Sequence, residues 1–256
     1  MGQLFAELSW LTIGMAAGVT FAAAFIKGAV GFGMPTIMIS GIGSFLSVEA
    51  ALAILIVPTV LTNAAQALRE GWRAAWESII RYRKFLLVGF VFLVLSAQLV
   101  LFLPSQVLFL LIGIPISLFA FSQLIGWRLH LRPDQRDRAE PIVGAVAGFV
   151  GGLSGVWGPP TVAYLTAIDA PKREQVRVQG VIYGLGAIAL MLAHIRTGIV
   201  SVETVPLSTT MLIPAFIGLW FGFQVQDRLD QEKFRRATLF VLVIAGLNLI
   251  RRGIMS

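Results

Sequence analysis

The chain has 256 residues, of which 57% are hydrophobic and only 13% are charged, and its net charge is +7. Ordinary soluble domains carry about 25% charged residues, and a single soluble core of this size does not hide so much apolar surface. The composition therefore excludes a soluble protein and predicts an all-α polytopic membrane protein. Its basic residues are expected against an anionic membrane surface rather than on nucleic acid.

Apolar stretches alternate with short polar segments along the whole chain. We expect helices, because backbone in lipid must satisfy its own hydrogen bonds within each segment. Two stretches, 33–47 and 159–169, are short and contain glycine or proline, so each either crosses as a broken helix or re-enters as a hairpin. The predicted stretches are 10–27, 33–47, 50–68, 85–103, 105–127, 141–157, 159–169, 175–195, 205–225 and 236–250.

The distribution of Lys and Arg favours ten crossing segments. The loops at 69–84, 128–140, 170–177 and 226–236 together carry 16 of the 20 Lys and Arg residues. If both short stretches cross, these four loops lie on one side, as cytoplasmic loops should. This topology puts the N-terminus outside. The alternative has eight spans and two re-entrant hairpins.

Two similar glycine-rich motifs, at 25–36 and 149–161, indicate an internal repeat. They predict a first transmembrane repeat at 1–127, a charged cytoplasmic linker at 128–140 and a second transmembrane repeat at 141–256. Each repeat has about five segments, one of them a short Gly/Pro-broken helix. Because five is odd, the two repeats are inverted in the membrane, an architecture in which transporters bind substrate at the repeat interface near the midplane.

The two motifs are also the predicted substrate site. Glycine and proline interrupt the helical ladder and free backbone groups at membrane depth, which is tolerated only under a cover of protein or water. The freed helix N-termini favour an anion, whereas the alternative interpretation is close packing of helices through small residues. The candidate residues are Gly31, Gly33, Pro35, Thr36, Ser154, Gly155, Trp157, Gly158, Pro159 and Thr161.

Two basic side chains near these motifs are further candidates. Lys27 directly precedes the first break, where a buried ammonium needs water or an anion; the alternative is that it snorkels to the interface. His194 is the candidate for proton coupling, although its place beside Arg196 also fits an interfacial histidine. No carboxylate lies in the middle of a predicted span, which keeps an anion channel as an alternative function.

Four polar residues inside predicted spans complete the candidate site. Asn63 and Gln66 are three positions apart, and Gln179 and Tyr183 are four apart, so each pair shares one helix face. In the site they would orient the oxygens of an anion. The alternative is hydrogen bonding between helices.

At both motifs the sequence resembles the TauE/SafE family of sulfite exporters, which are TSUP-type membrane transporters. The chain departs from the family pattern at Ala29, Val30, Phe32 and Trp157, where glycine is frequent. The resemblance implies transport of sulfite, organosulfonates or related small organic anions across a bacterial cytoplasmic membrane, and no enzyme activity. It rests on Gly28-Ala29-Val30-Gly31-Phe32-Gly33-Met34-Pro35, Gly151-Gly152-Leu153-Ser154-Gly155-Val156-Trp157-Gly158-Pro159-Pro160 and Lys172-Arg173-Glu174.

We therefore expect a secondary transporter that moves a small anion by alternating access, without a cofactor or a metal ion. The expected partners are the anionic substrate and the lipid bilayer, and a coupling proton and a homodimeric partner are further candidates. The alternatives are an anion channel and a non-transporting membrane assembly subunit. Enzyme signatures such as a P-loop or an HExxH helix are absent from the sequence.

Overall fold

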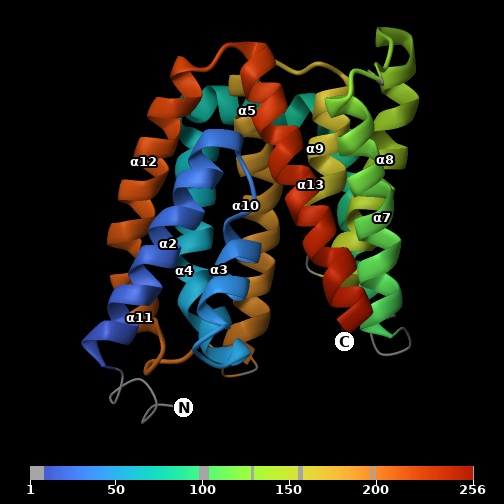
Figure 1. Cartoon of the computed structure of the whole chain (residues 1–256). Coiled ribbons are helices and arrows are strands. Elements are labelled where there is room, and N and C mark those ends of the chain that lie inside the picture. The colour runs from blue at the N-terminus through green and yellow to red at the C-terminus, as the bar shows by residue number, and fades with distance from the viewer. Residues whose placement is uncertain are drawn as a thin grey trace. The chain divides into compact units, whose positions relative to one another are not determined.

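A computed structural model describes residues 9–97, 104–127, 130–154, 158–196, 198 and 200–255. Within these residues the regular structure is entirely α-helical, which agrees with the predicted class (Figure 1). The helices are α2 (Trp10–Val30), α3 (Met34–Ile42), α4 (Val48–Leu68), α5 (Trp72–Arg81), α6 (Arg83–Ala97), α7 (Ser105–Leu124), α8 (Pro133–Ser154), α9 (Gly158–Ala167), α10 (Lys172–Arg196), α11 (Val205–Thr210), α12 (Leu212–Arg228) and α13 (Gln231–Met255).

Several of these helices are long and apolar enough to cross a bilayer. A helix rises about 1.5 Å per residue, so roughly 20 residues span the ~30 Å hydrocarbon layer. Among the described residues, the candidate spans are Trp10–Val30, Ala50–Leu68, Lys172–Leu192, Val205–Arg228 and Gln231–Met255.

The first of two compact units comprises Met1–Trp72 and Gln179–Leu229. In it α2 packs along α12, α3 contacts α2 and α4, and α11 contacts α4 (Figure 1). Its core is formed by fully buried side chains of α2, α3, α4 and α12, among them Met34, Met38 and Leu219.

The second unit comprises Arg73–Val178 and Asp230–Ser256. Here α6 packs along α8, α7 packs along α13, and the short α9 contacts α7, α8 and α13. Each unit therefore combines helices from both predicted halves of the chain. The boundaries between the units fall within α5, within α10 and between α12 and α13.

Small residues allow the paired helices to touch backbone to backbone. A Cβ atom on Gly28 of α2 would lie 2.5 Å from the Leu219 carbonyl oxygen of α12 and 2.9 Å from Gly222 Cα. In the second unit, a Cβ on Gly144 of α8 would lie 2.7 Å from the Phe85 carbonyl oxygen of α6. Such glycine-lined crossings are typical of membrane helices, which gain association energy from close packing rather than from the hydrophobic effect.

The predicted break in the first motif is present. Gly31 ends α2 and Gly33 precedes α3, and both have φ of 95°, a left-handed conformation that glycine adopts without steric cost. The Gly31 N–H donates to the Lys27 carbonyl oxygen at 2.6 Å, which closes the last turn of α2. Pro35 then lies in the first turn of α3, where its missing N–H costs no helical hydrogen bond.

The two short helices have less than the length of a full crossing. α3 has 9 residues and α9 has 10, which correspond to about 14–15 Å, half of the hydrocarbon layer. In the second motif α8 ends at Ser154 and α9 begins at Gly158, and residues 155–157 lie outside the described part. The crossing of the membrane by the stretches at 33–47 and 159–169 stays a prediction, with re-entrant hairpins as its alternative.

Three elements differ from the predicted stretches. The basic loop at 69–84 contains the amphipathic helix α5, whose alternating charges hide it from a search for continuous apolar runs. α8 begins at Pro133, so residues 133–140 of the predicted linker are helical. The stretch at 205–225 divides at Met211, because Pro214 cannot donate to the Thr210 carbonyl and its ring crowds that group.

A proline inside α4 creates a contact with α11. Pro58 cannot donate to the Ile54 carbonyl oxygen, which instead accepts a hydrogen bond from Ser208 Oγ at 2.9 Å. The same hydroxyl accepts from the Val57 N–H at 3.3 Å. Ser208 is fully buried, so this exchange satisfies backbone groups that would otherwise be orphaned.

Candidate substrate site

A buried lysine is the centre of the candidate site in the first unit. Lys27 lies in the last turn of α2 and only 2% of it is exposed. Its ammonium donates to Thr62 Oγ1 at 2.8 Å and to Asn63 Oδ1, both on α4. The snorkelling alternative is therefore wrong, since the side chain reaches another helix rather than the interface. Burial of a charged ammonium at membrane depth is costly, which makes Lys27 a candidate for binding an anion.

Lys27 has no acidic partner among the residues that the structure describes. It is the only charged residue between Trp10 and Val48 of the sequence. Within the part of the chain that the structure describes, its side-chain partners are the two neutral oxygens of Thr62 and Asn63, and it forms no ion pair. An ammonium has three N–H donors, so one donor is left for a further acceptor. An anion would supply both that acceptor and the missing negative charge.

The neighbouring face of α4 binds the helix break. Gln66 is fully buried, and its Nε2 donates to the Gly31 carbonyl oxygen at 2.9 Å. Thr62, one turn earlier, donates to the Pro58 carbonyl oxygen at 2.6 Å and lies 3.5 Å from the sulfur of Met34, the first residue of α3. Through these contacts Lys27, the break and the N-terminal end of α3 are held on one face of α4.

The start of α3 adds an electropositive helix end. Its cap residue is Gly33, and no side chain caps its first turn. The unpaired N–H groups of a helix N-terminus attract negative charge. Pro35 and Thr36 lie in this first turn and are half-buried.

Helix α10 packs against the same part of α4. A Cβ on Gly180 would lie 2.5 Å from the Ala67 backbone nitrogen, and a Cβ on Gly184 would lie 3.7 Å from Asn63 Cβ. The two glycines are one turn apart and form the contact face. Gln179 and Tyr183 lie beside that face, and both are buried.

Gln179 is the second unusual polar group. It is fully buried, and neither Oε1 nor Nε2 has a hydrogen-bond partner among the described residues. An unsatisfied buried amide costs about 1–3 kcal/mol, so such a group usually has a ligand or water as its partner. An amide can both donate to an oxyanion and accept from a protonated one.

The first unit therefore contains one subset of the predicted residues. Hydrogen bonds join Lys27, Gly31, Asn63 and Gln66, and α10 brings Gln179 and Tyr183 to the same helix. Thr62 and Met34 were missed by the sequence analysis. The available signal for Thr62 was its position four residues before Gln66, on the face already selected.

The remaining candidates lie elsewhere or outside the description. Gly158, Pro159 and Thr161 belong to α9 of the second unit, where Pro159 and Thr161 are buried. Gly155 and Trp157 lie outside the described residues, as do the side chains of Ser154 and His194. Their predicted roles stay predictions.

Comparison with known proteins identifies one family. The family model described as "Sulfite exporter TauE/SafE" matches residues 16–249, a range that includes both glycine-rich motifs and all the candidate site residues. No curated protein and no solved structure matches the chain.

Proposed function

The chain belongs to the sulfite exporter TauE/SafE family, and we propose that it is a secondary transporter that carries a small anion. Membership of this family makes it a multi-pass membrane transporter rather than an enzyme. The substrate class we propose is sulfite, an organosulfonate or a related small organic anion. The membrane we propose is the bacterial cytoplasmic membrane, with the basic loops inside and the N-terminus outside.

The observation that carries the proposal is the burial of Lys27 between neutral partners. The side chain is 2% exposed and is bonded to two neutral oxygens, so a bound anion removes the energetic cost of burying the ammonium. In this account the anion takes the third N–H of Lys27, and the electropositive start of α3 adds to the attraction.

Neutral groups around Lys27 would orient the anion. The free amide of Gln179 offers a donor, and Asn63 and Gln66 fix the lysine and the helix break in place. A pyramidal or tetrahedral oxyanion has several acceptor oxygens and can meet donors from different helices at once. A planar carboxylate has only two oxygens, so we expect weaker binding of small carboxylates.

The helix pairing supports the two-repeat architecture. α2 pairs with α12, and α8 pairs with α6, so each pair joins one helix from residues 1–127 with one from residues 141–256. Suppose that α8 is the repeat equivalent of α2, and that α12 is the repeat equivalent of α6. The α2–α12 pair and the α8–α6 pair are then built from the same two helices of the repeat, with the halves of the chain exchanged. This is the pattern expected of two inverted repeats that move against each other in alternating access.

We further propose that a proton is the coupling ion, with His194 as its candidate carrier, and that the protein is a homodimer.

Counterflow in proteoliposomes tests transport. Vesicles loaded with unlabelled sulfite and diluted into radioactive sulfite should accumulate label above the external concentration for a time, because a carrier exchanges one anion for another. The Lys27→Met variant should show no accumulation of label. The control is Lys84→Gln, which replaces a lysine of the second unit that pairs with Asp137, and it should behave as the unsubstituted protein.

The competing function is an anion channel, favoured by the lack of a carboxylate within the predicted spans. A channel predicts flux down the gradient, with no counterflow and no saturation. That result would replace the carrier, whereas no flux with any anion would contradict both.

A further inference from the structure

Helix α5 presents an apolar stripe whose side chains are at least half exposed. Trp72, Trp76 and Ile80 follow one another at intervals of four, so they share one side of the helix. Their exposed fractions are 67%, 52% and 50%. Ala75 and Ser78 of the same helix are buried. α5 is thus amphipathic, with one side against the protein and two tryptophans outward.

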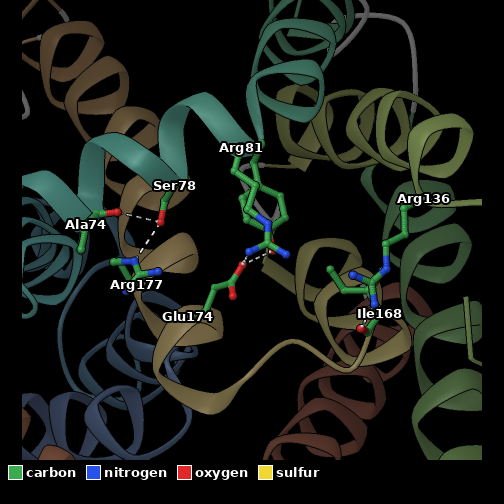
Figure 2. Close-up of polar contacts among 8 residues, drawn as sticks. Ala74, Ser78, Arg81, Arg136, Ile168, Glu174 and Arg177 are labelled. Atoms are coloured by element: carbon green, nitrogen blue, oxygen red, sulfur yellow. Dashed lines mark hydrogen bonds and ion pairs between the residues drawn. The ribbon is translucent and has the colours of Figure 1, made fainter. Parts of the chain in front are cut away.

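Polar contacts fix which side of α5 faces outward. Ser78 Oγ donates to the Ala74 carbonyl oxygen at 3.1 Å and accepts from Arg177 Nε of α10 at 2.8 Å. Arg81 Nη1 lies 3.1 Å from Glu174 Oε1, as Figure 2 shows. The tryptophan stripe therefore cannot rotate inward without breaking contacts with the first turns of α10.

A buried tyrosine strengthens this attachment. The hydroxyl of Tyr82 donates to Glu174 Oε1 at 2.8 Å. Burial, together with the neighbouring Glu174 carboxylate, raises the pKa of the Tyr82 phenol, so the hydroxyl stays protonated and remains a donor across the physiological range. Glu174 thus receives one hydrogen bond and one ion pair from the end of α5.

The next helix places α5 at the edge of the apolar layer. Only Tyr82 separates α5 from α6. α6 exposes Leu87, Phe90 and Val91, with exposed fractions of 67%, 62% and 53%. A helix with so large an apolar surface belongs in lipid. The end of α5 therefore lies within about two helical turns of the hydrocarbon layer, at the depth where tryptophan is enriched in membrane proteins.

Basic residues flank the stripe. Arg73 and Arg83 are exposed, and neither has a hydrogen-bond or ion-pair partner in the part of the chain that the structure describes. Glu77 is the only acid of α5. A helix with tryptophans on one face and arginines beside it has the composition of an interfacial helix on an anionic bilayer.

We propose that α5 is a lipid-binding helix that lies along the membrane surface, with Trp72, Trp76 and Ile80 in the interface and with Arg73 and Arg83 on anionic phospholipid headgroups. The occupant of the stripe is the leaflet itself rather than a protein partner. The positive charge of the flanks matches the negative charge of phosphatidylglycerol, and a protein surface supplies no such continuous negative layer.

The absence of cysteine from the chain allows single spin labels to test this placement. The full-length protein would carry a label at Arg73→Cys, Ile80→Cys or Leu87→Cys in phosphatidylcholine vesicles with phosphatidylglycerol. We expect the label at position 80 to collide with oxygen more than with a soluble nickel chelate, at a depth between those at 73 and 87. Equal nickel accessibility at 73 and 80, or shielding of 80 from both reagents, would overturn the proposal.

A second measurement tests the headgroup preference. A fluorophore at Ile80→Cys would be quenched by brominated phosphatidylglycerol or by brominated phosphatidylcholine at equal mole fraction. We expect quenching by the anionic lipid to exceed that by the neutral lipid by about twofold, because each surface arginine attracts anionic lipid.

The charge variants decide the source of that preference. Arg73→Gln with Arg83→Gln should bring the quenching ratio close to one. Arg228→Gln, which removes an exposed arginine from α12, is the matched control and should leave the ratio unchanged. A ratio of one in the parent protein, or an unchanged ratio in the double variant, would contradict anionic lipid as the occupant.

Discussion

Lys27 of the first unit and the paired cations Arg81 and Lys84 of the second unit lie in opposite surroundings. In the second unit, Arg81 is 59% exposed at its side chain and pairs with Glu174, while Lys84 pairs with Asp137. In the first unit, Lys27 is almost completely buried, and its side chain donates to the neutral Thr62 and Asn63. The arginine pair needs no ligand, because its charge is already balanced. Lys27 has the hydrogen bonds that orient it but not the charge that would neutralise it.

The difference separates structural from functional charge. A paired, half-exposed cation contributes modestly to stability and is screened by water and salt. A buried lysine whose partners are neutral can bind an anion, so its substitution should lower the anion affinity more than the stability of the protein.

Gly222→Val should have the largest effect, because it pushes α12 away from α2 beside Lys27. A side chain there would meet the Phe25 carbonyl oxygen and Gly28 Cα, next to the lysine, so α12 can no longer approach α2. We expect a loss of about 3 kcal/mol of stability, measured by thermal unfolding in detergent. Gly18→Val is the control, because a Cβ on Gly18 meets nothing within 4 Å. Equal stability of the two variants would refute the tight α2–α12 crossing.

Gln179→Leu should weaken anion binding about tenfold, which is the loss of one hydrogen bond to a charged ligand. The protein without anion should become about 1 kcal/mol more stable, because an unsatisfied buried amide is removed. Anion titrations followed by thermal stability measure both effects. Gln224→Leu, at a half-buried position of α12, should change neither. An unaltered affinity in Gln179→Leu would exclude Gln179 from the site.

Glu174→Gln should lower the stability and leave the anion affinity unchanged, the reverse of Gln179→Leu. The variant loses the ion pair with Arg81 and keeps a carbonyl acceptor for Tyr82, so we expect a loss of about 1 kcal/mol of stability and an unchanged anion affinity. The same titrations provide the measurement. A large fall in affinity at constant stability would show that this cluster, and not only Lys27, serves the anion.

Lys84→Gln should have the smallest effect. The Lys84 ammonium lowers the pKa of the Asp137 carboxyl. A lowered folded-state pKa stabilises the protein above the unfolded pKa of the carboxyl, and this contribution is lost as the pH falls through the folded pKa. Melting curves of the parent and the variant should therefore differ slightly at neutral pH and coincide in acid. A difference that grows with acidity would contradict this ion pair.

The sequence was most informative where local chemistry decides the structure. Glycines and a proline at 31–35 predict a helix break, and the spacing of Asn63 and Gln66 predicts a shared face, both of which are present. α5 was missed because its apolar residues recur with the helical period among charges instead of forming a continuous run.

Burial and long-range contacts could not be predicted in the same way. Lys27 had two interpretations, and only the position of Thr62, 35 residues later, decides between them. The unpartnered state of Gln179 depends on every helix around it, which no local pattern encodes. The pairing of α2 with α12 joins segments far apart in the chain, and no local pattern predicts which helices pair.

The most direct test of the account is the anion-dependent stability of the purified protein, compared with that of Lys27→Met. In a panel of sulfite, thiosulfate, sulfonates, sulfate and small carboxylates, the substrate anion should selectively raise the melting temperature of the parent. At 100 times the Kd its free energy of unfolding should rise by about 2.7 kcal/mol. The variant should show no shift, and its stability without anion should stay within about 1 kcal/mol of the parent. A full anion shift in Lys27→Met would contradict the central role of the buried lysine.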